Sequence, residues 1–341
     1  MKNIPTVSII TPCYNSVSWL PACMESLTSQ SIGMENLEWI FIDDASSDNT
    51  LAILQDFEAR FPEQVILIPL TENQGQGFAR NLALSYASGD YVLYVDSDDA
   101  IAPYALELLL KHAASLNCDI LEFDFTRTPD AWTHQTDAFA IVPVSCQVTD
   151  SASRQVYCTS VPRSGIICNK LYRRDLLVEH QIRNAEHLAH EDTLFSQLVS
   201  FYVDSYAYLP VPLYFYRLNI NSTMLKGQID DFHQFDRLKV QMQFLEECEQ
   251  RGFLKDYYFA VEAMFVRTYY IDTLLFVLDR FTYAPLAQLQ IMQNTVRTCF
   301  PSWRANPFLS QQQSPIEQLL FSTLEHTFTS ENFLALKNQI L

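Results

Sequence analysis

The composition of this chain of 341 residues indicates a globular protein that does not bind nucleic acid. Hydrophobic residues make up 48% and charged residues 18%, so the chain can bury a sizeable core and shows no bias towards disorder. The 22 basic and 40 acidic residues give a formal net charge of -18, which repels DNA, RNA and anionic membrane surfaces.

Cysteine usage and hydropathy favour a cytoplasmic location. The 8 cysteines include no Cys-x-x-Cys pair, and a chain of this size does not depend on disulfide bonds. The start of the chain lacks the apolar run of an export signal. Residues 257–278 could pass for a membrane span, but Glu262, Arg267 and Asp272 make insertion unfavourable. We therefore expect a cytoplasmic protein without a transmembrane segment, and a peripheral position at the inner face of the membrane stays open.

The first part of the chain alternates between short apolar runs and apolar residues at helical spacing. Strands are expected at residues 7–11, 38–43, 65–69, 91–95 and 120–126. Helices are expected at residues 17–29, from about 51, and at 78–87 and 103–116. Alternation of this kind predicts an α/β fold with a mostly parallel sheet flanked by helices.

The second part of the chain changes character. Residues 127–163 are expected to form loops and short elements, followed by helices at 169–180 and 193–202 and strands at 206–209 and 213–217. Beyond these, long helical patterns occupy residues 230–249, 254–278 and 285–299. This change predicts two domains, an α/β domain over residues 1–225 and an all-helical C-terminal domain over residues 226–341.

The stretch YVLYVDSDD at residues 91–99 is the most informative part of the sequence. Its uncharged start suits a buried central strand, and ligands of parallel sheets bind beyond the carboxyl ends of the strands. Asp96, Asp98 and Asp99 repel one another, so a hard cation such as Mn²⁺ or Mg²⁺ would relieve them. Such a cation completes its shell with water and phosphate oxygens, which points to a nucleotide substrate. The alternative from this stretch alone is a solvated acidic turn.

Polar clusters follow four of the predicted strands, at residues 12–15, 43–48, 73–81 and 96–99. The carboxyl ends of parallel strands share one edge of a sheet, so these clusters are expected to converge on one crevice. Glycines 75 and 77 allow close backbone approach there, and Arg80 in the following helix would meet a phosphate or brace the acidic loop.

The order and spacing of several motifs resemble the family 2 glycosyltransferases, inverting sugar-nucleotide enzymes with a GT-A fold. The motifs are VSIITPCYN, FIDDASSDNT, NQGQGFARNLAL, SGDYVLYVDSDD, CNKLYRR and HEDTLF. The resemblance covers roughly residues 5 to 225 and leaves the helical tail outside it.

The resemblance implies roles for residues in the nucleotide site. Asp98 would be the principal metal ligand, with Asp96 at the ribose or in the metal shell. Asp44 would accept the N3 hydrogen of uracil, and Pro12 and Tyr14 would line the base. A helix-capping role for Asp44 is the structural alternative.

Transfer of the sugar also needs a base that takes the proton of the acceptor hydroxyl. In the family an acidic residue at the start of the helix that HEDTLF begins has this role, and Asp192 is favoured over Glu191. The alternative is that Asp192 caps the helix.

Together these observations predict an inverting glycosyltransferase that moves a hexose or N-acetylhexosamine from a UDP-sugar to a saccharide acceptor. Both a free and a lipid-linked saccharide are open as the acceptor. The product would belong to a cell-surface polysaccharide or glycoconjugate. Two alternatives stay open, a nucleotidyltransferase acting on a sugar phosphate and a non-catalytic saccharide-binding module. The helical tail is rich in aromatic residues, so a homo-oligomer formed through it is also expected.

Overall fold

The computed structural model describes residues 7–127, 135–160, 165–217, 232–310 and 314–341. The chain divides into two compact units. The first contains Met1–Thr149, Arg163–His187 and Val199–Asn219, and the second contains Asp150–Pro162, Leu188–Leu198 and Ile220–Leu341. The predicted domain boundary between residues 225 and 226 lies outside the described residues.

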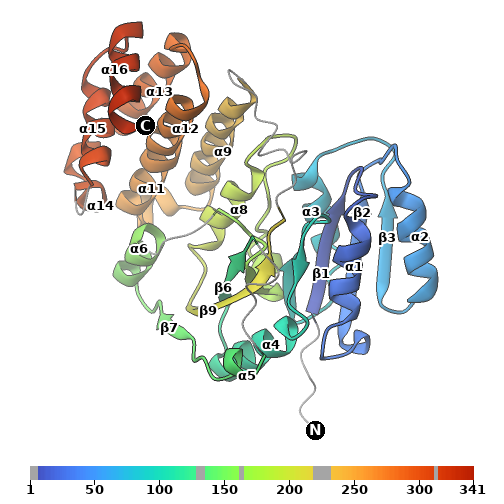
Figure 1. The fold of residues 1–341 in the computed structure, drawn as a ribbon. Helices are drawn as coiled ribbons and strands as arrows, with labels where there is room; N and C mark the ends of the chain where they lie inside the picture. Colours follow the sequence, from blue (N-terminus) through green and yellow to red (C-terminus); the bar gives the residue numbers. More distant parts are fainter. Residues whose placement is uncertain (1–6, 128–134, 161–164, 218–231, 311–313) are drawn as a thin grey trace. The chain divides into compact units, whose positions relative to one another are not determined.

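A nine-stranded mixed sheet forms the centre of the first unit (Figure 1). Its strands run in the order β3-β2-β1-β4-β8-β6-β9-β5, with β7 paired to β9. Their bounds are β1 Val7–Cys13, β2 Leu37–Asp43, β3 Val65–Pro69, β4 Tyr91–Tyr94, β5 Ala100–Ile101, β6 Ile120–Thr126, β7 Val144–Gln147, β8 Lys170–Arg173 and β9 Ser205–Phe215. Strands β1 to β4 pair in parallel, while β5, β7 and β8 pair antiparallel to their neighbours.

The register of the parallel strands places their carboxyl ends at one level. Cys13 lies opposite Asp43, and Asp43 lies opposite Pro69. At the fourth strand Tyr94 pairs with Ile10, and the N–H of Val95 donates to the Ile10 carbonyl. The loops that follow all four strands therefore begin at the same edge of the sheet, as predicted from the sequence.

Helices of the first unit cover the sheet through their apolar faces. Their bounds are α1 Leu20–Thr28, α2 Thr50–Arg60, α3 Gln76–Leu84, α4 Ala105–Leu116, α5 Gln135–Ala138 and α7 Arg174–Glu179. Helix α3 packs on β1 and β2, and α2 packs on β2 and β3. The N-terminal strands have a tightly packed aromatic cluster, in which Trp39 lies 5.0 Å from Phe41 and 5.1 Å from Phe57 between ring centroids. This core makes the edge above it a rigid platform.

The second unit is helical. It contains α6 Ser151–Ser160, nearly all of α8 Glu191–Val199, and α9 Asp236–Gln250, α10 Phe253–Asp256, α11 Tyr258–Phe265, α12 Thr273–Arg280, α13 Leu286–Cys299, α14 Pro307–Ser310, α15 Pro315–Ser322 and α16 Ser330–Ile340. Figure 1 shows α9, α11, α12, α13, α15 and α16 gathered into a bundle. Between α11 and α12 the chain forms a π-helix, η4 (Val266–Asp272). The predicted helical character of residues 254–278 is thus confirmed, with a break at Tyr257 between α10 and α11 and a π-helical stretch further on.

Two predictions of secondary structure differ from the structure. Residues 169–180 were expected to be one helix, but the first part forms β8, which pairs with β4 and β6, and only the remainder is helical. The expected strands at 206–209 and 213–217 are a single strand, β9, that continues through Pro210 and Pro212 with shifts of register against β6. In both cases pairing with distant strands outweighs local preference.

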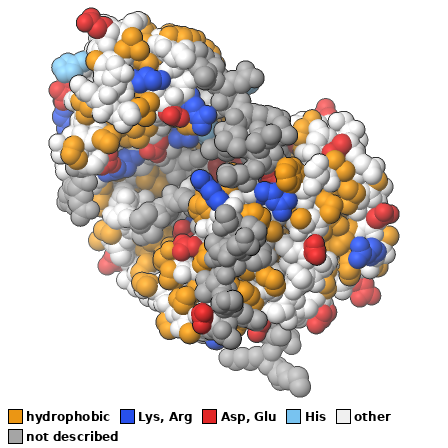
Figure 2. Space-filling view, in the orientation of Figure 1, with side chains coloured by type: hydrophobic (Ala, Val, Ile, Leu, Met, Phe, Trp, Pro, Cys, Tyr) orange, Lys and Arg blue, Asp and Glu red, His pale blue; other side chains and the backbone are white. Residues whose placement is uncertain are grey.

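Charged side chains are widely distributed over the described surface. Figure 2 shows acidic and basic side chains interspersed with apolar ones on one face. In the described ranges no helix is long and apolar enough to cross a bilayer. The fold class predicted from the sequence, a mostly parallel α/β sheet with helices and a helical C-terminal region, is confirmed.

Candidate active site

Hydrogen bonds join the four polar clusters at the carboxyl edge of the sheet. Asn15, which has a left-handed backbone with φ 49°, accepts hydrogen bonds at Oδ1 from the N–H groups of Ser47 (2.8 Å) and Asp48 (3.3 Å). The hydroxyls of Ser16 and Ser97 lie 2.7 Å apart. The loops after β1, β2 and β4 therefore form one connected surface.

Asp44 ties the second cluster to the glycine loop. Its Oδ1 accepts the N–H of Gln74 at 2.7 Å, and its Oδ2 accepts the N–H of Gly75 at 2.8 Å and the side-chain amide of Asn73 at 3.0 Å. Gly75 has φ 83°, a conformation that suits glycine. Asp44 is only 3% exposed. A carboxylate oxygen can accept two hydrogen bonds, so Oδ1 keeps capacity for one more donor.

Arg80 holds Asp96 in place. The buried Arg80 guanidinium donates from Nη2 to Asp96 Oδ1 over 2.7 Å, while 29% of the Asp96 side chain stays exposed. The thiol of Cys168 lies 3.5 Å from the other carboxylate oxygen, Oδ2. Burial and the Asp96 carboxylate both raise the pKa of the Cys168 thiol, so the thiol stays protonated and can donate. Arg80 was expected either to bind a phosphate or to brace the acidic loop, and in this structure it braces the loop by pairing with Asp96.

Asp99 is buried and has a different environment from its neighbours. Its Oδ2 accepts the hydroxyl of Tyr214 at 2.6 Å, and its Oδ1 accepts the backbone N–H of Arg217 at 2.8 Å. Burial, together with the nearby Asp96 and Asp98 carboxylates, raises the pKa of Asp99 to about 8. Tyr214 also accepts the N–H of Asp96 at 3.2 Å. Asp99 therefore anchors the acidic loop to β9, a function that sequence reasoning missed because Tyr214 is distant in the chain.

Asp98 and Asp96 are both half-buried, whereas Asp99 is buried. No group of three or more His, Cys, Asp and Glu side chains within the described part of the chain is arranged to hold a metal ion. Mg²⁺ and Mn²⁺ need few protein ligands when a diphosphate and water supply the others. The hard oxygen donors of Asp98 and Asp96 fit that requirement.

The residues expected around the base lie at the same edge. Pro12 is buried within β1, and Tyr14 follows with its side chain exposed to 52%. The Tyr14 ring is thus accessible for stacking on a planar ligand.

The candidate base residues start helix α8. Glu191 is 2% exposed, whereas Asp192 is half-buried. A proton acceptor must be reachable by its substrate, so the burial difference favours Asp192. These residues belong to the second compact unit, in contrast to the four clusters, which belong to the first.

Basic residues of the CNKLYRR motif are occupied by structural contacts. Lys170 donates to the Ile166 carbonyl at 2.7 Å and lies 3.8 Å from Glu122, and Arg173 pairs with Asp119 at 3.1 Å. The guanidinium of Arg217 lies over the ring of Trp19, 5.2 Å from its centroid.

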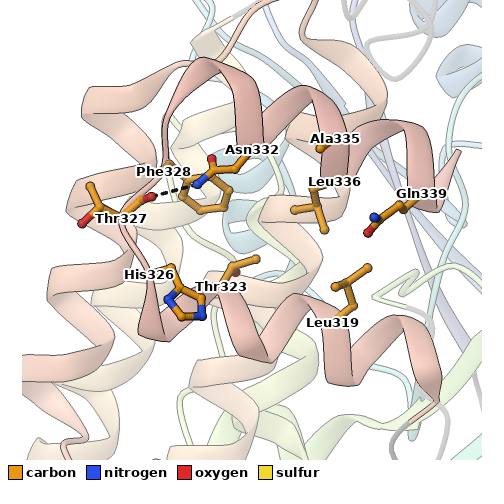
Figure 3. Close-up of a pocket in the computed structure, with 9 residues that line it drawn as sticks. All are labelled: Leu319, Thr323, His326, Thr327, Phe328, Asn332, Ala335, Leu336 and Gln339. Carbon is orange, nitrogen blue, oxygen red and sulfur yellow. Dashed lines mark hydrogen bonds between the residues drawn. The ribbon is translucent and has the colours of Figure 1, made fainter.

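A separate pocket of about 170 Å³ lies in the helical unit (Figure 3). Its lining includes Leu319, Phe328 and Leu336, and the side-chain amide of Asn332 donates to the Thr327 carbonyl at 2.9 Å. None of its lining residues is a predicted site residue.

The family model described as "Glycosyl transferase family 2" matches residues 8–180, which is more than half of the chain. The chain belongs to glycosyl transferase family 2. The match spans the four clusters and extends through β8 and α7.

Curated relatives of this glycosyltransferase share part of its length. The putative glycosyltransferase EpsH of Bacillus subtilis (strain 168) is 29% identical over 229 residues, which are 66% of this chain and 64% of EpsH. The poly(ribitol-phosphate) beta-N-acetylglucosaminyltransferase TarS of Staphylococcus aureus (strain MW2) is 28% identical over 235 residues, which are 68% of this chain and 39% of TarS. The chain therefore spans less than two thirds of either relative.

Solved structures confirm the GT-A fold of this glycosyltransferase. S. aureus TarS 1-349 in complex with UDP-GlcNAc superposes with a TM-score of 0.57 at 22% identity, covering 97% of this chain and 83% of that one. The mannosyltransferase PcManGT from Pyrobaculum calidifontis, in complex with GDP-Man and Mn²⁺, gives a TM-score of 0.50 at 15% identity, covering 94% and 86%. At these identities the likeness establishes the fold alone.

Proposed function

We propose that this glycosyltransferase moves a hexose or N-acetylhexosamine from a UDP-sugar to a saccharide acceptor, with inversion at the sugar carbon and assistance from Mn²⁺ or Mg²⁺. The observation that carries the proposal is the joining of four polar loops at the carboxyl edge of the sheet, in a chain of this family. Asp44, Arg80 and Asp96 fix the geometry of that edge, and Asp98 is left half-buried beside it.

Donor binding rests on residues of the first unit. Tyr14 would stack on the base and Pro12 would shape the loop beneath it. Asp44 would accept the N3 hydrogen of uracil on the free position of Oδ1. A Mn²⁺ or Mg²⁺ ion at Asp98, with Asp96 beside it, would neutralise the charge that develops on the departing diphosphate.

The chemical step needs a base, for which we propose Asp192. Asp192 takes the proton of the acceptor hydroxyl, whose oxygen forms a bond to the anomeric carbon. The bond between that carbon and the diphosphate oxygen breaks, and its electron pair leaves with the nucleoside diphosphate. A single displacement inverts the configuration at the anomeric carbon. Asp192 acts only in this step, so its loss lowers the rate and spares donor binding.

The donor and the product are proposed from the relatives. UDP-GlcNAc is bound in the TarS structure, and both TarS and EpsH are named as glycosyltransferases, TarS for a ribitol-phosphate polymer. By analogy the acceptor here would be a saccharide of a cell-surface polymer, either free or linked to a lipid. The enzyme would then work in the cytoplasm or at the inner face of the membrane, and its helical C-terminal domain, expected from residue 226, would support a homo-oligomer.

A donor panel tests the proposal. Purified protein is incubated with UDP-, GDP- and other nucleotide sugars, each with Mn²⁺, Mg²⁺ or chelator, and released nucleotide is measured by chromatography. Release of UDP from one UDP-sugar, dependent on a divalent cation, is expected. Release of pyrophosphate would instead favour a nucleotidyltransferase. Absence of turnover together with absence of a nucleotide-dependent thermal shift would refute the proposal.

A further inference from the structure

Helix α8, which carries the candidate base, is preceded by a residue with an unfavourable backbone conformation. His190 has φ 62°, in the left-handed region that residues with a side chain rarely adopt. Its carbonyl accepts the N–H of Thr193 at 3.2 Å and so takes part in the first turn of α8. Such a conformation persists only where surrounding contacts hold it.

Contacts to the His190 ring stabilise this backbone conformation. His190 Nε2 lies 3.2 Å from Gln234 Oε1, and Arg237 Nη2 lies 3.4 Å from His190 Nδ1. Arginine can only donate, so Nδ1 acts as the acceptor and the ring proton lies on Nε2, directed at Gln234. Burial and the charge of Arg237 both lower the pKa of His190, which fits the neutral ring that this geometry requires. The ring edge also contacts Phe276, with 6.1 Å between centroids.

Arg237 is the charged member of this group. It lies in the first turn of α9, and its guanidinium is 5.6 Å from the centroid of the Phe276 ring. Burial lowers the pKa of Arg237, and the carboxylates of Asp272 and Asp192 oppose that shift by attraction. Arg237 thus contacts the residue that precedes α8, and the negative charge of Asp192 acts on the pKa of Arg237.

Hydrogen bonds of Gln197 hold the C-terminal half of α8 in place. The side-chain amides of Gln197 and Gln241 exchange hydrogen bonds of 3.3 and 2.8 Å, and Gln197 also donates to the Thr268 hydroxyl at 3.2 Å. Gln241 is fully buried on α9, and Thr268 lies in the π-helix η4. Figure 1 shows α8 beside α9. A π-helical stretch is rare and is frequently found where function requires it.

We propose that Arg237 is a positioning residue for the base Asp192, holding the first turn of α8 through His190 and directing the Asp192 carboxylate. The inference rests on the proposed function, because it assumes that Asp192 is the base. It makes the helical C-terminal region part of the catalytic machinery, since Gln234, Arg237, Gln241 and Phe276 all come from that region.

Kinetics of three variants test this role. In Arg237→Gln the side chain loses its charge, and kcat is expected to fall about 10- to 100-fold because misplacing a catalytic group has effects of this order. KM for the donor is expected to stay within about twofold, since donor binding does not involve α8. Arg237→Lys keeps the charge and is expected to recover part of kcat. Arg280→Gln is the control, because Arg280 lies over the same Phe276 ring at 5.5 Å, from α12.

Hydrogen exchange provides a measurement that does not depend on activity. Mass spectrometry of peptides covering residues 190–196 is expected to show faster exchange in Arg237→Gln than in Arg280→Gln. Unchanged exchange, or equal kcat in these two variants alongside an inactive Asp192→Asn, would overturn the positioning role and leave the proposed function intact. An active Asp192→Asn, or no turnover of any donor, would overturn the base assignment and with it this inference.

Discussion

Arg80 on α3 and Asp96 after β4 form an ion pair of 2.7 Å in which the cation is almost entirely buried and the carboxylate is partly exposed. The pair joins the glycine loop to the acidic loop and uses one oxygen of Asp96. The position of the Asp96 carboxylate is thus fixed by a basic residue sixteen positions earlier in the chain.

The first prediction concerns this pair. Arg80→Gln leaves Asp96 without its charged partner, and we expect the free energy of unfolding to fall by about 1–3 kcal/mol. The double variant Arg80→Gln/Asp96→Asn should recover part of that loss, because the unpaired carboxylate is removed as well. Denaturant unfolding of the four proteins of this cycle measures the coupling. Strictly additive effects would show that the pair does not stabilise the site.

The second prediction concerns metal binding. Asp98→Ala is expected to weaken Mn²⁺-dependent binding of UDP by at least about tenfold, since even indirect supports of metal ligands have effects of this size. Isothermal calorimetry of UDP binding with Mn²⁺ and with chelator measures the change. Asp56→Ala, an exposed acidic residue on α2, is the control and should bind as the wild type does. A metal response in Asp98→Ala equal to that of the control would contradict the assignment.

The third prediction concerns the glycine loop. In Asp44→Asn one of the two accepting oxygens becomes an amide that faces a backbone N–H, so stability should fall by about 1–3 kcal/mol even without nucleotide. The donor KM should rise as the loop loosens. Glu72→Gln is the matched control, because the exposed Glu72 accepts from the side chain of Gln74 in the same loop at 2.8 Å. Thermal unfolding and donor titration distinguish the two, and equal melting temperatures would argue against the anchoring role.

The fourth prediction separates the two acidic residues at the start of α8. Asp192→Asn should lower kcat by about 10²- to 10⁴-fold, the usual range for loss of a general base, while UDP binding persists. Glu191→Gln changes a buried side chain and should affect stability more than the ratio of kcat to KM. Steady-state kinetics and UDP calorimetry on both variants check this. Near-normal transfer by Asp192→Asn would make Glu191 the next candidate.

The fifth prediction concerns pH. Burial raises the pKa of Glu262 above its ordinary value of 4.5, although Asn306 donates to its Oε2 at 2.7 Å. An acid with a raised folded pKa stabilises the fold most below its unfolded pKa and loses that contribution as the pH rises through the folded value. The melting temperature should therefore fall less steeply above about pH 4.5 in Glu262→Gln than in the wild type. Glu249→Gln, an exposed glutamate on α9, should leave the wild-type slope unchanged.

Local sequence patterns determined the framework of the site. The predicted strands at residues 7–11, 38–43 and 91–95, and the polar residues after them, were enough to predict parallel strands whose loops meet at one edge. Strand and helix periodicities depend on a residue and its near neighbours, so they can be read along the chain. The same holds for the acidic stretch Asp96 to Asp99 and for the helical character of residues 254–278.

The tertiary structure decided what each of these polar residues does. Tyr214 and Asp99 are separated by 115 positions and share a hydrogen bond, and the Arg80 guanidinium pairs with one oxygen of Asp96. The strand at Lys170–Arg173 exists because β4 and β6 flank it, although its local pattern resembles a helix. His190 and Arg237 meet because α8 packs with the C-terminal helices. Contacts between residues far apart in the chain leave no periodic trace in the sequence, so their partners become known only when the chain is folded.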